Sequence, residues 1–530
     1  MKTDSGTTES LWMQTSRLPK GEPLRQNLHA DVCVVGAGIT GLTTAYLLAC
    51  ENKSVVVLDD GRIGGGETAR TSGHLATGLD DRYHRLEKYH GEGGARLAAE
   101  SHARAIDRIE EICRSEHIDC DFRRIDGYLF VPPGESEGEL FRELEAAQRA
   151  GLHDVELVPR LPVDCYDFGP ALRFPRQARF HALRYLNGLA ACVIERRGSI
   201  HTQSFVEHIE DGDPVRVRIA GGHAVTATDV VVATNSPMNN LFTPHTKQAS
   251  YRSYVIVLRI PGGWLPDLLA WDTPDPYHYL RQARSEDPDW DLLIVGGEDH
   301  KTGQSGGAGD APFRRLERWT RERFPMAREM VAAWSGQVVE PIDGLAYIGR
   351  NPHDRHVYLA TGDSGNGLTH GTIAGLLITD LIQGRDNPWA RLYAPARVPL
   401  RAAAAFAREN LNVAAQYAGL LAAGDLAGSQ ELRPGQGAIL RRGLHKIAAY
   451  RDEEGLLHEH SAICTHLGCA VEWNATEETW DCPCHGSRFD KRDGHVVNGP
   501  AASGLANVLE DGRSERPPLP ERGEARQPRR

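Results

Sequence analysis

The hydrophobic and polar positions of the chain show two kinds of pattern, which take turns over most of its length. Short runs rich in β-branched residues predict buried strands, and longer stretches with apolar residues at helical spacing predict helices. The first three segments form a strand, a helix and a second strand at residues 32–35, 39–50 and 54–58. Because strands and helices alternate, we expect an α/β body, in which later elements include helices at 136–150 and 370–383 and a strand at 225–233.

The regions that flank this body differ from it in composition. Residues 1–29 are polar and aperiodic, which predicts a loose N-terminal arm before a body that covers 30–386. Residues 387–431 are rich in alanine and predict a helical connector. Short strands separated by turn residues follow at 432–510, as in a small all-β domain. The last segment, 511–530, is charged and rich in proline, so that we expect it to be disordered.

Length and charge narrow the class of partner. A chain of 530 residues is too long for one hydrophobic core, so that two or three packed units are expected. The formal net charge of -12 argues against nucleic acid and is compatible with a small-molecule substrate. No apolar run reaches the roughly 20 residues of a membrane span, and the N-terminus lacks the apolar core of a signal peptide. We therefore expect a cytoplasmic protein without a membrane span.

A glycine-rich turn joins the first predicted strand to the first helix. Its sequence is Gly36-Ala-Gly38-Ile-Thr-Gly41, in which glycines permit a tight turn and close approach of a pyrophosphate to the helix N-terminus. Asp59 ends the second strand, where a carboxylate can accept a hydrogen bond from a ribose hydroxyl. The turn and the acid together predict a dinucleotide site, but they do not distinguish FAD from NAD.

Further segments carry a resemblance that favours FAD. They are residues 64–74, 334–349 and 360–371, and they resemble the D-amino-acid oxidase and glycine oxidase family of FAD-dependent amine oxidoreductases over residues 30–385. The resemblance implies a Rossmann-type FAD-binding domain with an antiparallel substrate sheet. It also implies that two segments lie beside the flavin, with the residues Arg70, Thr71, Ser72, Gly362, Gly365 and Gly367.

The candidates for a catalytic or substrate-binding role are three residues. Tyr279 and Arg281 alternate on a predicted strand and could bind a substrate carboxylate, or they could form one face of a solvated strand. His74 lies in a stretch that resembles dimethylglycine-dehydrogenase relatives, whose histidine is bonded covalently to the flavin. The alternative for His74 is a hydrogen bond near the flavin ring. No catalytic base can be assigned from the sequence.

The C-terminal domain contains two loops that each bring one cysteine and one histidine together. They are Cys464-Thr-His466-Leu-Gly-Cys469 and Cys482-Pro-Cys484-His485-Gly-Ser487. A Rieske [2Fe-2S] centre requires two thiolates on one iron and two imidazoles on the other. A zinc site would also use two cysteines and two histidines, but it would leave the second cysteine of each loop unexplained.

The two loops resemble those of respiratory Rieske proteins over residues 432–510. The resemblance implies that Cys464, His466, Cys482 and His485 bind the cluster and that Cys469 and Cys484 form a disulfide. It also implies that Ser487 donates a hydrogen bond to a bridging sulfur and that the Gly499-Pro500-Ala501 loop covers the cluster. Phe489 replaces a tyrosine of the respiratory proteins, and the loss of that donor should lower the reduction potential.

Together these features predict an FAD-dependent oxidoreductase that oxidises a small amine or amino acid. Electrons would pass from FAD through the cluster to an external acceptor. The alternative is a carrier or reductase, in which an external donor charges the cluster and the cluster feeds the flavin or a partner protein. A Rieske oxygenase would also need a mononuclear iron site, and the sequence offers no convincing set of two histidines and one carboxylate for it.

Overall fold

The computed structural model describes residues 5–16, 19, 21–236, 247–304, 309–398, 400–421, 424–426 and 428–508. The predicted disordered tail at 511–530 lies outside these residues. Within them, no helix combines the length and the apolar character that would let it cross a membrane.

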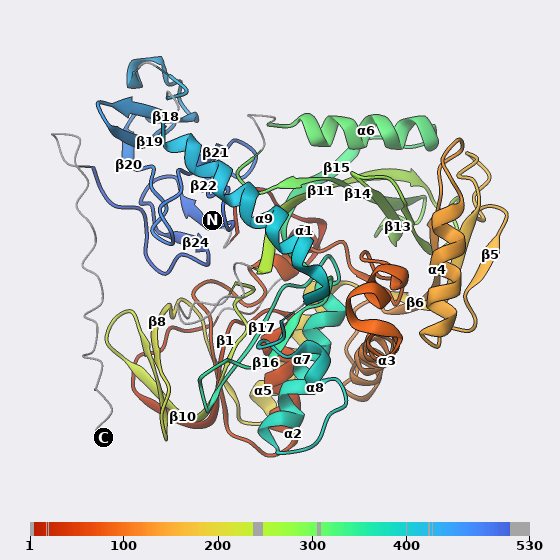
Figure 1. Ribbon diagram of the computed structural model, residues 1–530, viewed down its shortest axis with the longest axis horizontal. Coiled ribbons are helices and arrows are strands. Elements are labelled where there is room, and N and C mark those ends of the chain that lie inside the picture. Colours follow the sequence, from red (N-terminus) through yellow and green to blue (C-terminus); the bar gives the residue numbers. More distant parts are fainter. Residues whose placement is uncertain are drawn as a thin grey trace.

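A mainly parallel sheet contains the first predicted strand, helix and second strand of the body (Figure 1). Its order is β16-β17-β10-β1-β2-β7, and β8 and β9 extend from β10 as a hairpin. Apolar residues of one sheet face pack against the helices, while the opposite face packs against this hairpin. The strands are β1 Leu28–Val35, β2 Val55–Leu58, β7 Ser199–His201, β8 Val206–Glu210, β9 Val215–Ile219, β10 Ala224–Val232, β16 Tyr347–Arg350 and β17 Val357–Thr361. The helices are α2 Ile39–Cys50, α3 Tyr83–Ser115, α5 Ala182–Glu195 and α7 Gly367–Ile382.

A second sheet lies beside the first and is antiparallel except where β4 runs parallel to β12. Its order is β15-β11-β14-β13-β12-β4-β6-β3, with β5 paired to β6. The strands are β3 His74–Leu75, β4 Arg123–Phe130, β5 Glu156–Val158, β6 Ala171–Arg179, β11 Gln248–Pro261, β12 Leu268–Asp272, β13 His278–Arg284, β14 Trp290–Lys301 and β15 Met330–Pro341. Helix α6 Ala311–Arg323 covers β11 and β14, and α4 Gly138–Arg149 packs against α3.

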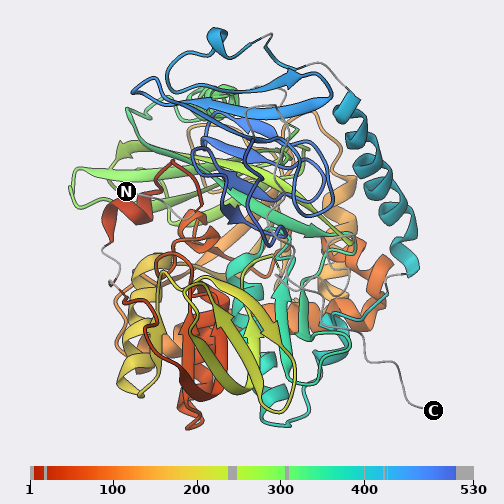
Figure 2. The ribbon, with the colours of Figure 1, turned by 90° about the vertical axis from the view of Figure 1, so that its left-hand side faces the viewer.

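The C-terminal domain consists of two small antiparallel sheets, which Figure 2 shows stacked on the second sheet of the body. One contains β18 Gly437–Arg442, β19 His445–Arg451 and β20 Leu457–Ser461. The other contains β21 Glu472–Asn474, β22 Thr479–Asp481, β23 Arg488–Asp490 and β24 Val496–Asn498. The connector is helical, as predicted, with α8 Ala390–Tyr393, η3 Leu400–Ala402, α9 Ala403–Gln416, η4 Tyr417–Leu421 and η5 Ser429–Glu431.

The prediction of a loose arm at 1–29 is wrong for the residues that the structure describes. Helix α1 Leu11–Thr15 buries Leu11 and Trp12, and the ring nitrogen of Trp12 donates to the carbonyl of Thr71 at 2.5 Å. The strand β1 also begins four residues earlier than predicted, at Leu28 instead of Val32. The apolar residues of the arm are too few to produce a periodic pattern, but they are buried in contacts with distant segments.

Candidate functional site

A cavity of about 330 Å³ lies where the strands of the first sheet end. Val35, Leu58, Ala233 and Thr361 mark the carboxyl ends of β1, β2, β10 and β17 and line it. The carboxyl edge of a parallel sheet is where α/β folds bind nucleotides. Residues of the second sheet and of the C-terminal domain complete the wall. Three separate parts of one chain therefore enclose this cavity.

The predicted glycine turn forms one end of the cavity. Gly36 has φ +108°, and a Cβ atom there would lie 2.4 Å from the carbonyl oxygen of Ala233. A Cβ atom on Gly41 would lie 1.8 Å from the carbonyl oxygen of Gly36, so that no side chain fits at either position. Gly38 precedes α2 and has no side chain to cap it, and the N–H of Ile39 donates to Thr68 Oγ1 at 3.1 Å. Ile39 and Thr40 line the cavity, so that the helix N-terminus, the positive end of its dipole, faces the place of an anion.

Asp59 supports this turn from the end of β2. Its Oδ2 atom accepts from the backbone N–H of Ala37 at 2.6 Å, and its Oδ1 atom accepts from Gly61 at 2.9 Å. Asp59 also lines the cavity. The Asp59 carboxylate thus lies at the end of β2, where the sequence predicted a contact with a ribose hydroxyl. It also holds the glycine turn through the bond from Ala37.

The late glycine segment forms the other end of the cavity. Gly362 and Gly365 have φ values of +74° and +73°, which side chains rarely adopt, and Gly367 begins α7. Asn366 caps α7 without a side-chain hydrogen bond, so that a second helix N-terminus faces the cavity. Asp80 approaches Gly365 so closely that a Cβ atom on that glycine would lie 2.0 Å from its carboxylate.

Arg70, Thr71 and Ser72 all line the cavity, but the guanidinium of Arg70 is engaged elsewhere. Its Nη1 atom donates to Glu477 of the C-terminal domain at 3.0 Å and to the carbonyl of Ser335 at 2.8 Å. The sequence predicted Arg70 as a cofactor residue and gave no sign of this ion pair.

His74 stands beside the predicted substrate strand. Ser72 Oγ lies 2.8 Å from its Nδ1 atom, and its Nε2 atom lies 3.4 Å from the carbonyl of Leu280. A carbonyl only accepts, so that Nε2 carries the proton and Nδ1 accepts from the serine hydroxyl. Burial, with a smaller effect of the Arg281 charge, lowers the pKa of His74 to about 3, so that the ring is neutral.

The structure separates the other two catalytic candidates. Tyr279 lines the cavity and meets the His74 ring edge-on, with 5.4 Å between the ring centroids. Arg281 is buried outside the lining, where its guanidinium lies against the Trp12 ring and donates to the carbonyl of Phe180 at 3.3 Å. Sequence reasoning missed Tyr277, Ser253 and Asp80, which line the same part of the cavity.

In the C-terminal domain the two cysteine and histidine loops face each other. Cys464 and Cys482 are buried within hydrogen-bonding reach of each other, and the rings of His466 and His485 have centroids 5.0 Å apart. Burial lowers the pKa of both histidines, to about 4 for His485, which keeps them in the neutral form that binds metal. The Nδ1 atom of His485 is buried without a hydrogen-bond partner among the described residues.

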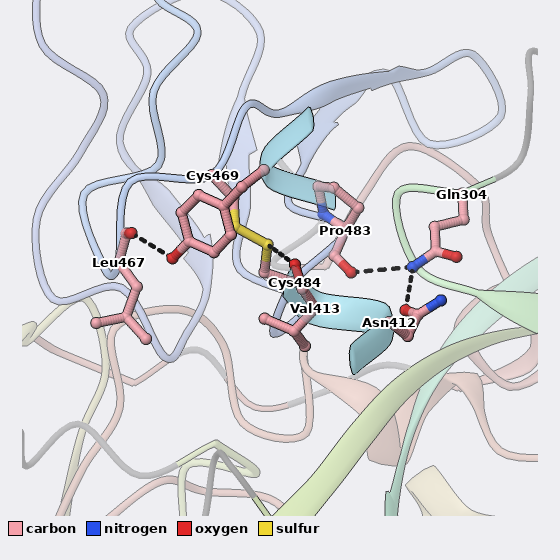
Figure 3. Close-up of a disulfide and its surroundings, with 8 residues drawn as sticks. Gln304, Asn412, Val413, Leu467, Cys469, Pro483 and Cys484 are labelled. Carbon is pink, nitrogen blue, oxygen red and sulfur yellow. Dashed lines mark hydrogen bonds between the residues drawn. A yellow bond between two sulfur atoms is a disulfide. The ribbon is translucent and has the colours of Figure 1, made fainter. Parts of the chain in front are cut away.

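A disulfide joins Cys469 to Cys484 and ties the two loops together (Figure 3). Sulfur atoms of Cys469, Cys482 and Cys484 lie within 4.8 Å of one another, so that Cys482 is the free thiol of this group. Ser487 is fully buried and accepts from the backbone N–H of Ala501 at 3.0 Å, which connects the second loop to the Gly499–Ala501 segment.

Comparison with known proteins supports both sites, the cavity at the sheet edge and the cysteine and histidine loops of the C-terminal domain. Residues 31–381 match the model of the FAD dependent oxidoreductase (DAO) family, and residues 424–509 match the Rieske [2Fe-2S] domain. The chain belongs to the FAD-dependent oxidoreductase family and carries a C-terminal Rieske domain. The Rieske match also decides against zinc, the alternative that the cysteine and histidine pattern left open.

Individual relatives and solved structures show how much of the chain these similarities cover. YhfW of Bacillus subtilis, named as a Rieske 2Fe-2S iron-sulfur protein, is 30% identical over 508 residues, which cover 94% of this chain and 97% of the relative. The gamma-glutamylputrescine oxidoreductase of Escherichia coli is 29% identical over 68% of this chain and 86% of the relative. Glycine oxidase from Geobacillus kaustophilus shares the fold, with a TM-score of 0.58 at 19% identity over 70% of this chain and all of that structure.

The residues present fit the two cofactors that these families bind. Two helix N-termini that face the cavity and a turn without room for a Cβ atom suit the pyrophosphate and flavin of FAD. In the Rieske domain the unpartnered Nδ1 atom of His485 suits a metal bond, because a buried ring nitrogen otherwise requires a hydrogen bond. The protein therefore has sites for FAD and for a [2Fe-2S] cluster in one chain.

The Rieske domain also closes the flavin cavity. Val496, Asn498, Gly499 and Ala501 line the same cavity as the glycine turn. The sequence did not reveal whether the two domains meet at this site, and the structure shows that residues of the Rieske domain form part of the cavity wall. Asn498 lies in no recognisable sequence motif. It lines the cavity only because the two domains dock against each other.

Proposed function

We propose that the protein oxidises a small amine or amino acid and passes the electrons from FAD through the Rieske cluster to an external one-electron acceptor. The observation that carries this proposal is the shared cavity, because residues of the Rieske domain line the wall of the flavin site. The substrate would lose two electrons and two protons to give an imine, and two equivalents of the acceptor would take the electrons. Bound FAD supplies two-electron chemistry, and the cluster supplies one-electron steps.

The proposed cofactor ligands follow from their placement. Gly36, Gly38, Gly41 and Asp59 would hold the nucleotide end of FAD, and the segments at 70–72 and 362–367 would lie along the flavin. Cys464, His466, Cys482 and His485 would bind the cluster, which the neutral histidines and buried cysteines support.

The substrate part of the cavity favours an amine without a carboxylate. Arg70 is the one guanidinium among the described lining residues, and Glu477 occupies it. Tyr279 remains a candidate for binding the substrate, whereas Arg281 would have to act from behind the cavity wall. Burial raises the pKa of Asp80 to about 6, which suits a group that takes the proton of an ammonium substrate near neutral pH. The names of the E. coli and Geobacillus proteins support the wider class that includes amines and amino acids, within which this cavity favours the amines.

Absorption and EPR spectra of the anaerobic protein, recorded before and after addition of amines and amino acids, test this proposal. Bleaching of the flavin together with a reduced Rieske signal is the expected result for a substrate. If dithionite produces the Rieske signal and no amine does, the carrier or reductase function with reverse electron flow takes precedence.

The cytoplasmic location stays a prediction from the sequence.

A further inference from the structure

The second cluster loop is held against the flavin domain by three side chains. Gln304 Nε2 donates to the carbonyl of Pro483 at 3.2 Å, and Ser250 Oγ donates to the carbonyl of His485 at 3.2 Å. Gln337 Nε2 donates to the carbonyl of Gly486 at 2.8 Å, in a buried bond. These carbonyls belong to residues 483–486, so that the ligand His485 lies between fixed points.

Gln337 differs from the other two because it has contacts in three directions. Its Oε1 atom accepts from Asn498 Nδ2 at 2.5 Å, and Asn498 lines the flavin cavity at the end of β24. Its backbone N–H donates to Glu67 Oε2 at 2.7 Å, and both Gln337 and Glu67 line that cavity as well. Gln337 is 4% exposed, so that water does not compete for these bonds. Gln304 and Ser250 do not line the cavity.

We propose that Gln337 is a positioning residue that couples the two redox centres, because one side chain joins the loop of His485 to the wall of the flavin cavity. The role rests on electron exchange between the centres, which is part of the proposed function, but not on its direction or on the substrate. One electron moves between the centres in this step, and no bond forms or breaks. Gln337 fixes the path by holding the loop and β24 in one arrangement.

The space around Gly486 explains why this contact is close. Gly486 has φ +77°, and a Cβ atom there would lie 2.5 Å from Gln337 Nε2 and 2.4 Å from Ser250. The absence of a side chain lets the loop backbone lie directly against the flavin-domain strands β11 and β15. A glycine after the ligand histidine is thus required by the docked arrangement of this chain.

The test uses full-length protein with both cofactors and needs no substrate. A light pulse in the presence of 5-deazaflavin delivers one electron, and absorbance follows its redistribution between flavin and cluster. We expect Gln337→Ala to slow this redistribution by about tenfold, the lower end of the effects on metal affinity or activity that follow the loss of an outer hydrogen-bond partner at a metal site. Gln304→Ala is the matched control, because it removes a bond to the same loop without touching the cavity (Figure 3). It should keep the wild-type rate.

Equal rates in wild type and Gln337→Ala would overturn the proposal. Equal slowing in Gln337→Ala and Gln304→Ala would overturn it too, because it would indicate that these contacts only hold the domains together. If Gln337→Ala does not fold, Gln337→Glu serves instead. It keeps the size of the side chain and places an acceptor against the carbonyl of Gly486, and it should slow the redistribution and alter the EPR line shape of the reduced cluster. Failure of every amine to reduce the flavin would contradict the proposed function without affecting this result.

Discussion

At the scale of single residues, burial selects the chemical form of the side chains that would bind the cluster. Cys464 and Cys482 are each 2% exposed, and the two histidines are neutral. Two thiols with two neutral imidazoles match the ligand set of a Rieske centre. Because each thiolate would bond directly to iron, replacing one of them should remove the cluster.

We predict that Cys464→Ser loses the reduced Rieske EPR signal and the bound iron, while the flavin absorbance remains. Iron analysis and EPR after dithionite reduction measure this. Cys50→Ser, which changes an exposed cysteine at the end of α2, is the control and should retain both signals. A normal Rieske signal in Cys464→Ser would show that the ligand assignment is wrong.

His74 yields a second prediction at this scale, that the flavin is not covalently bound. Both ring nitrogens of the neutral His74 ring take part in hydrogen bonds, to Ser72 and Leu280. A histidine held in this way has no free nitrogen for a bond to the flavin. Precipitation with acid should therefore release all of the FAD into the supernatant. Flavin that remains with the precipitated wild-type protein and is lost in His74→Ala would contradict this prediction.

At the scale of elements, the connector helix protects the disulfide of the cluster loops. Cys469 and Cys484 are 1% and 6% exposed, and the carbonyl of Val413 on α9 contacts the Cys484 sulfur at 4.0 Å. Just after the helix, Tyr417 donates to the carbonyl of Leu467 at 2.7 Å. Figure 3 shows Leu467 and Val413 near the disulfide. A reductant can reach the disulfide only when these contacts open.

We predict that Tyr417→Phe is reduced faster by dithiothreitol under native conditions. Loss of one hydrogen bond of about 1 kcal/mol corresponds to roughly fivefold easier opening. Alkylation of the released thiols followed by mass spectrometry measures the rate, with the exposed Cys50 thiol as an internal standard. Tyr89→Phe, on α3, should react like wild type, and an unchanged rate in Tyr417→Phe would mean that α9 does not protect the bond.

The elements themselves were largely predictable from the sequence. The helix predicted at 39–50 is α2, and the strand predicted at 225–233 is β10 with a shift of one residue at each end. Glycine turns and metal-ligand loops were recognisable because their chemistry restricts a few neighbouring positions. The N-terminal arm was not, since Trp12 and Thr8 make their contacts with residues far away in the sequence.

At the scale of the whole molecule, the docking of the two domains depends on a buried charge cluster. No sequence motif predicts this cluster. Glu477, in the turn between β21 and β22, is fully buried. It accepts from Arg70 at 3.0 Å and from Arg252 at 3.1 Å, both in the flavin domain, and from the hydroxyls of Thr8 and Ser335. The sequence around Glu477 gives no sign of these contacts, because the four partners come from four segments that are distant in the sequence.

We predict that Glu477→Gln destabilises the protein by about 3–5 kcal/mol, because it leaves buried arginines without a counter-charge. Thermal unfolding, together with proteolysis of the connector at residues 403–421, should show that the domains separate before either unfolds. Glu459→Gln is the control, since Glu459 pairs with the partly exposed Arg442 on the surface of the Rieske domain. It should change stability by less than about 1 kcal/mol.

The same cluster predicts how acid acts on the assembly. Burial alone would raise the pKa of Glu477, but Arg70, Arg252 and Arg488 outweigh it and lower the pKa from 4.5 to about 2. A carboxylate whose pKa is depressed in the folded state contributes stability above its unfolded value and loses it as the pH falls through the folded value. Docking should therefore weaken between about pH 4.5 and pH 2, and wild type should lose its advantage over Glu477→Gln across this range. A stability difference between the two proteins that stays constant from pH 6 to about pH 2 would show that Glu477 does not carry this charge in the docked state.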